Sequence, residues 1–125
     1  MLEKEDICAD ETLHALEAIG FKRTEYSVSI YEAYKFIRRA YNTHIEPYKQ
    51  IIDTMPLGSW EQDKQYRVRL IINMEGVKHL PLTHTLSDDD GKHRFFDTYE
   101  DALQAGILSC CKTIDYIIKN DMKLL

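Results

Sequence analysis

Apolar residues recur at steps of three and four through residues 95–118, which is the most regular hydrophobic pattern in the chain. This pattern is typical of a helix that packs one stripe against a core and leaves its other side in water. Asp97 and Glu100 have the spacing of a capping box, in which each side chain accepts from the backbone N–H of the other residue, so we expect the helix to begin there. The stripe consists of Tyr99, Leu103, Ile107, Cys110, Ile114 and Ile117.

A first helix is predicted from about Asp6 to Gly20, because apolar residues at helical spacing supply a buried side. Glycine readily adopts the left-handed conformation that ends a helix. Phe21 follows at the position where a Schellman motif places an apolar residue over Leu16. The end of this helix is therefore better specified than its beginning.

A second helix is predicted from Ser29 to about Tyr41. Ser29 and Glu32 repeat the capping-box spacing, and Asn42 is a residue that commonly ends a helix. The apolar side of this helix consists of Ile30, Ala33, Phe36, Ile37 and Ala40.

Three strands are predicted between the second helix and the last one. Residues 44–49 form a short strand, and Pro47 favours a sheet edge because proline lacks a backbone donor. Residues 65–73 alternate between a core face and a partly wet face and form the clearest strand. Residues 78–87 form a third strand, in which Pro81 again favours an edge.

The predicted order is helix, helix, strand, strand, strand, helix. Short connections between the strands favour antiparallel pairing. We therefore expect an α+β fold with an antiparallel sheet of three or four strands and helices packed on one face. The size is that of one domain, so we expect a single domain over residues 1–125, with an acidic N-terminal helix at 1–20 and a core at 29–120.

The charge of the chain is uneven, although its 125 residues carry a net charge of only −5. Residues 1–20 contain six acidic residues and one lysine, a balance of −5. Residues 21–50 contain six basic and three acidic residues, a balance of +3. The second predicted helix and its flanks are therefore the only locally basic segment.

Three cysteines, two of them adjacent, favour reduced thiols over a disulfide framework. No apolar run approaches the roughly 20 residues that span a bilayer. Residues 1–20 also lack the basic start and apolar centre of a secretory leader. We therefore expect a cytoplasmic protein without a membrane partner.

Two segments stand out together, SIYEAYKFIRRAYNTHIEPY at 29–48 and FDTYEDALQAGILSCCKTI at 96–114. They resemble a group of small uncharacterised proteins of bacteriophages and mobile elements, especially of gut anaerobes. In that group the first segment reads A-x-K-W-L-R-E followed by H-I-x-I, and the second reads F-x-x-Y-E-E-A-L-x-A-G-L. Here Phe36 replaces the tryptophan and Arg39 replaces the acid. The resemblance covers about a third of the chain and implies a small phage-like α+β protein, without implying an activity.

The usual catalytic motifs are missing from the sequence, which contains no glycine-rich phosphate loop, Gly-x-Ser-x-Gly elbow, His-Glu-x-x-His or Cys-x-x-Cys. The aspartates at 88–90 do not begin an EF-hand loop, because its sixth and twelfth positions would be His93 and Tyr99. Cys110 and Cys111 lie far from a helix N-terminus that would lower a thiol pKa. We therefore expect no enzyme activity, no metal and no cofactor.

The second predicted helix carries the best candidate for a binding surface, since arginine and tyrosine are enriched at protein interfaces and can also contact phosphates and bases. A net acidic domain without an active-site motif favours a protein partner, which would contact either this helix or the edge strands that contain Pro47 and Pro81, with nucleic acid as the alternative. If the tyrosines instead pack at the core margin and the cations only face solvent, this helix has no binding role. The candidate residues are Tyr34, Lys35, Arg38, Arg39 and Tyr41, extended by Arg67 and Arg69 of the second strand if these lie near the helix.

Overall fold

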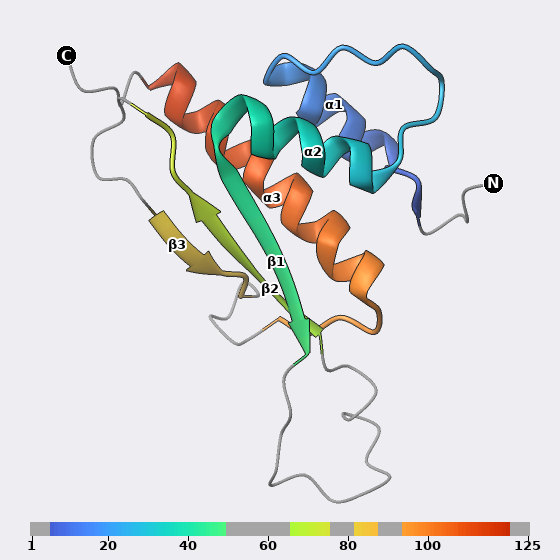
Figure 1. Ribbon diagram of the computed structural model, residues 1–125, viewed down its shortest axis with the longest axis vertical. Coiled ribbons are helices and arrows are strands. Elements are labelled where there is room, and N and C mark those ends of the chain that lie inside the picture. Colours follow the sequence, from blue (N-terminus) through green and yellow to red (C-terminus); the bar gives the residue numbers. More distant parts are fainter. Residues whose placement is uncertain (1–5, 50–65, 76–81, 88–93, 121–125) are drawn as a thin grey trace, which may run out of the picture.

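The structure is a computed structural model that describes residues 6–49, 66–75, 82–87 and 94–120 (Figure 1). Its elements are α1 (Asp10–Ala18), α2 (Ile30–Tyr41), β1 (Thr43–Lys49), β2 (Tyr66–Ile72), β3 (Leu82–Thr85) and α3 (Tyr99–Lys119). The three strands form an antiparallel sheet in the order β1-β2-β3, and the helices lie on one face of it. The predicted α+β class and the predicted order of elements are confirmed.

The two strands that contain or adjoin a proline lie at the edges of the sheet, as predicted. In the central strand, Val68, Leu70 and Ile72 are buried toward α3, and the alternate residues Arg67 and Arg69 face the other way. The third strand ends at Thr85, two residues before the predicted end, and positions 78–81 of that prediction lie outside the described residues.

The first helix begins at Asp10 and not near Asp6, because the backbone before it pairs with another segment. The N–H of Cys8 donates to the carbonyl of Val28 at 2.8 Å, which holds this stretch extended. The predicted end is confirmed, since Gly20 has φ 100° and the N–H of the next residue donates to the carbonyl of Leu16 at 3.0 Å.

The predicted bounds of α2 are confirmed at both ends. The Ser29 hydroxyl accepts from the N–H of Glu32 at 3.1 Å, and Asn42 ends the helix with a left-handed φ of 48°. The predicted apolar side is wider than the buried one, because Phe36 is only half-buried and Ala40 is exposed. This leaves apolar surface on the outside of α2.

The predicted capping box of α3 is wrong by one residue. The N-cap is Thr98, whose side chain accepts from the N–H of Asp101 at 3.1 Å, so Asp97 lies outside the helix. Both residue types cap helices well, and local sequence therefore decides weakly between them.

Helix α3 is the centre of the fold and not a surface helix with a single wet side. It packs against β1 and β2 on one side and against α1 and α2 on the other (Figure 1). A Cβ atom at Gly106 would lie 2.6 Å from Ile45 Cγ2 and 2.8 Å from Val68 Cγ2, so the helix rests directly on the sheet. Tyr99, predicted in the buried stripe, is 40% exposed. Within the described ranges, no helix is long and apolar enough to cross a membrane.

Candidate interaction surface on the second helix

The structure divides the seven predicted binding residues into two sets. Five of them lie on α2, on the helix side of the sheet, whereas Arg67 and Arg69 lie on the face of β2 that turns away from α3. The predicted extension of the α2 surface by these two arginines therefore does not form, because strand alternation directs them to the opposite face.

Arg67 and Arg69 contact aromatic residues on their own side of the sheet. The Arg67 guanidinium lies 5.7 Å from the ring centroid of Phe95, and this arginine is only 8% exposed. The Arg69 guanidinium lies 5.2 Å from the ring centroid of Tyr48, and its Nη1 is 3.8 Å from Oε2 of Glu46 on the neighbouring strand.

Two of the three tyrosine hydroxyls on α2, those of Tyr34 and Tyr41, attach the helix to β1 and to the end of α1. The Tyr34 hydroxyl accepts from the N–H of Ile45 at 3.3 Å, so α2 satisfies a backbone donor at the outer edge of β1. The Tyr41 hydroxyl donates to the carbonyl of Ile19, and burial raises the pKa of this hydroxyl. The tyrosines therefore hold α2 in place, and the exposed cations Lys35, Arg38 and Arg39 form its outer surface.

A surface hollow of about 620 Å³ lies at the C-terminal end of α2, and we call it the terminal hollow. Its walls come from the end of α2, from the residues that follow β2 and from the end of α3. A hydrogen bond joins two of these walls, since the side-chain amide Nδ2 of Asn42 donates to the backbone carbonyl of Asn73 at 3.2 Å. The lining residues are Arg38, Arg39, Ala40, Tyr41, Asn42, Met74, Glu75 and Ile118.

A second hollow of about 410 Å³ adjoins the first along the outside of α2, and we call it the lateral hollow. Phe36 contributes aromatic surface to it, and its ring is held in edge-to-face contact with Phe21 and Tyr41 at centroid distances of 5.2 and 6.0 Å. The two hollows share Arg39 and Ala40, and together they form what we call the α2 groove. The lateral hollow is lined by Glu32, Lys35, Phe36, Arg39 and Ala40.

Three cations and two acids line the α2 groove, which gives it a balance of +1 in a chain with a net charge of −5. Arg38 is oriented by the ring of Tyr34, whose centroid lies 5.6 Å from the guanidinium carbon. Arg39 is exposed and borders both hollows. The groove therefore combines guanidinium donors with apolar walls, a combination suited to binding a partner that carries both carboxylate and apolar groups.

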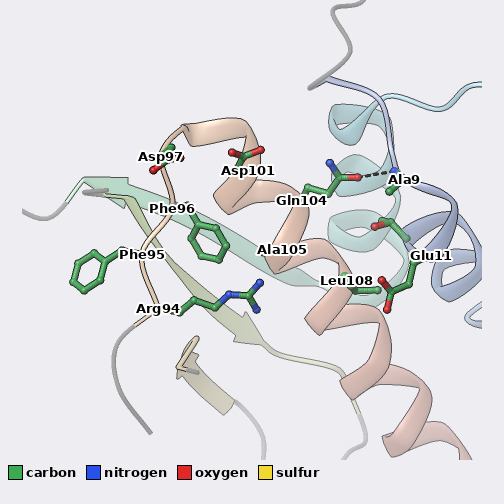
Figure 2. Close-up of a pocket in the computed structure, with 11 residues that line it drawn as sticks. Ala9, Glu11, Arg94, Phe95, Phe96, Asp97, Asp101, Gln104, Ala105 and Leu108 are labelled. Atoms are coloured by element: carbon green, nitrogen blue, oxygen red, sulfur yellow. Dashed lines mark hydrogen bonds between the residues drawn. The ribbon is translucent and has the colours of Figure 1, made fainter. Parts of the chain in front are cut away.

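A third hollow of about 400 Å³ lies between the start of α1 and the start of α3 (Figure 2). There the N–H of Ala9 donates to Gln104 Oε1 at 2.6 Å, and the Arg94 guanidinium lies 4.9 Å from the ring centroid of Phe96. Sequence reasoning did not find this hollow, because its walls come from two stretches that are far apart in the chain, residues 9–12 and 94–108. Its carboxylates come from Glu11, Asp97 and Asp101.

The cysteines are buried in the core and are unsuited to nucleophilic chemistry. Burial raises the pKa of Cys8 to about 11 and that of Cys111 to about 12, and it raises the pKa of Cys110 further. A thiol with such a pKa stays protonated near neutral pH, and the thiolate is the nucleophile. In the described part of the chain, no three histidine, cysteine, aspartate or glutamate side chains gather as a metal site would require.

Comparisons with protein-family models, with curated proteins and with solved structures each returned no match.

Proposed function

We propose that this chain is a small binding module of the bacteriophage and mobile-element type that its two segments resemble, and that it contacts a protein partner in the cytoplasm. The observation that carries the proposal is the α2 groove, in which two adjoining hollows share an exposed arginine. We propose binding and not catalysis, because the buried thiols are protonated and the groove presents cations beside apolar walls.

The composition of the groove supports a protein partner. Arginine, methionine and aromatic residues are enriched at protein interfaces, and the groove contains Arg38, Arg39, Met74 and Phe36. The helix that forms it is attached to β1 and α1 through its tyrosines, so the groove exists before a partner arrives. A preformed surface binds more tightly because less conformational freedom is lost on association.

Nucleic acid is the second candidate partner, and the adjacent exposed cations Arg38 and Arg39 favour it. The groove also contains Glu32 and Glu75, however, and these carboxylates would lie beside a phosphate backbone. The separation of Arg69 from α2 further reduces the number of phosphates that one surface could contact. A protein partner therefore explains the groove better.

The test is a pull-down with the tagged full chain from a lysate of the organism that encodes it, with and without nuclease. We expect the wild-type chain to retain a protein in stoichiometric amount after nuclease treatment. We expect Arg38→Gln/Arg39→Gln to lose this protein, because the change removes both guanidinium groups of the groove.

The matched control is Lys22→Gln/Arg23→Gln, which removes the same charge from exposed positions outside the groove. It should retain the partner. Equal retention by all three chains would overturn the assignment of the groove. Retained nucleic acid that disappears only in Arg38→Gln/Arg39→Gln would establish the alternative partner instead.

A further inference from the structure

We infer that the α2 groove recognises a short acidic–apolar segment of its partner, in which one carboxylate lies between two apolar side chains and binds Arg39. This inference rests on the proposed function, since it names the chemistry of the partner at the same surface. It follows from the order in which charged and apolar residues line the two hollows.

Each hollow of the groove contains one acid and one cation of its own, Glu32 with Lys35 in the lateral hollow and Glu75 with Arg38 in the terminal hollow. Glu32 lines only the lateral hollow, Glu75 lines only the terminal hollow, and Arg39 lines both. A carboxylate at the middle of a bound segment would therefore face a guanidinium, which can donate two parallel hydrogen bonds to it. An acid at either end of the segment would instead meet a hollow whose own acid and cation offset each other, so the groove selects a single central acid.

Apolar surface is present on both sides of Arg39. The lateral hollow offers the ring of Phe36, whose position is set by its contacts with Phe21 and Tyr41. The terminal hollow offers Met74 and Ile118, and Ile118 is 43% exposed. Each hollow can thus cover one apolar side chain of the segment.

The length of the groove matches an extended segment of five residues. From Glu32 to Asn42 the helix rises by about 15 Å, at about 1.5 Å for each residue. Five extended residues span about 14 Å over four steps, and their first, third and fifth side chains point to one side. The pattern Leu-x-Glu-x-Leu therefore places its acid beside Arg39 and one leucine in each hollow.

The test measures fluorescence anisotropy of three labelled peptides that are blocked at both ends and contain Leu-Ser-Glu-Ser-Leu, Leu-Ser-Gln-Ser-Leu or Ser-Ser-Glu-Ser-Ser. We expect the full chain to bind the first with a Kd of about 1 mM or below, as suits a single short segment. The glutamine peptide, which lacks the carboxylate, should bind about tenfold more weakly, and the all-serine peptide, which lacks both leucines, should lose at least as much affinity.

Variants of the full chain connect the binding to the groove. Arg39→Gln should weaken binding of the first peptide by about tenfold, which is the effect of losing a charge-assisted hydrogen bond. The control Arg23→Gln removes the same charge from an exposed position outside the groove and should bind as the wild type does.

Three outcomes would overturn the inference: equal affinity for the glutamate and glutamine peptides, wild-type affinity in Arg39→Gln, or no saturable binding of the first peptide. These outcomes are distinguishable from failure of the proposed function. If the pull-down retains a protein only when Arg38 and Arg39 are intact, the proposed protein-binding role stands. Failure of the peptides to bind would then show that the groove recognises a different chemistry in that partner.

Discussion

At the scale of the residue, Gly106 decides how closely α3 approaches the sheet. The nearest atoms to an added methyl group belong to Ile45 and Val68, which are both β-branched residues in paired strands. Such side chains have few alternative rotamers and cannot easily move aside. A glycine in the middle of a helix otherwise costs stability, and here the close contact explains its presence.

We expect Gly106→Ala to lower the free energy of unfolding by about 1–2 kcal/mol, measured by urea denaturation. Overpacking costs about 1–3 kcal/mol, and the better helix propensity of alanine returns up to about 1 kcal/mol. Adding Val68→Ala removes one of the crowded methyl groups and should recover part of the loss, which a double-mutant cycle would show as a coupling energy. An unchanged or increased stability in Gly106→Ala would contradict the close contact.

At the scale of the element, two capping signals with the same spacing had different outcomes. Ser29 caps α2 as its sequence predicts, but Thr98 replaces Asp97 as the cap of α3. Asp97 and Thr98 are adjacent and are both good caps, so a helix capped by Asp97 and one capped by Thr98 have similar local free energies. The residue before Asp97 is held by a nonlocal contact, since the N–H of Phe96 donates to the carbonyl of Tyr66 at 2.7 Å, and such pairing can settle a choice between two similar helix starts.

The contact between α2 and the edge of β1 provides a second prediction. We expect Tyr34→Phe to lower the free energy of unfolding by about 1 kcal/mol, because the N–H of Ile45 loses its acceptor. The amide proton of Ile45 should also exchange faster with solvent, which hydrogen exchange by NMR would measure. The control is Tyr116→Phe, which removes a hydroxyl from a residue that is 62% exposed. It should change neither the free energy of unfolding nor the exchange rate at Ile45. Unaltered exchange at Ile45 in Tyr34→Phe would refute the contact.

At the scale of the whole molecule, the core is closed by residues from all three helices and the sheet, and it also contains the three thiols. Burial raises the pKa of Cys8 and Cys111 from 9.0 to about 11 and about 12. As the pH rises, these thiols therefore lose their protons at a lower pH in the unfolded chain than in the folded chain. Between the unfolded and folded values, the unfolded state binds fewer protons, so stability must fall with rising pH.

We expect the free energy of unfolding to decrease as the pH rises from about 9 toward 12, when it is measured by urea denaturation at several pH values. The stabilising effect of the protonated thiols is complete below about pH 9 and is lost through the folded pKa values. Cys8→Ala/Cys111→Ala removes two of these groups and should show a weaker pH dependence over this range. An identical slope in the double variant would mean that other groups cause the effect.

Sequence alone determined the kinds of elements, their order and the bounds of α2, because hydrophobic period, proline and capping residues act over a few neighbouring positions. It also identified α2 as the basic helix that carries the candidate surface. Only the tertiary structure decided that Arg67 and Arg69 lie on the other face, that α3 is covered on two sides, and that Met74 and Ile118 join Arg39 in one hollow. These outcomes depend on contacts between residues far apart in the chain, and no local pattern encodes which distant side chains will meet.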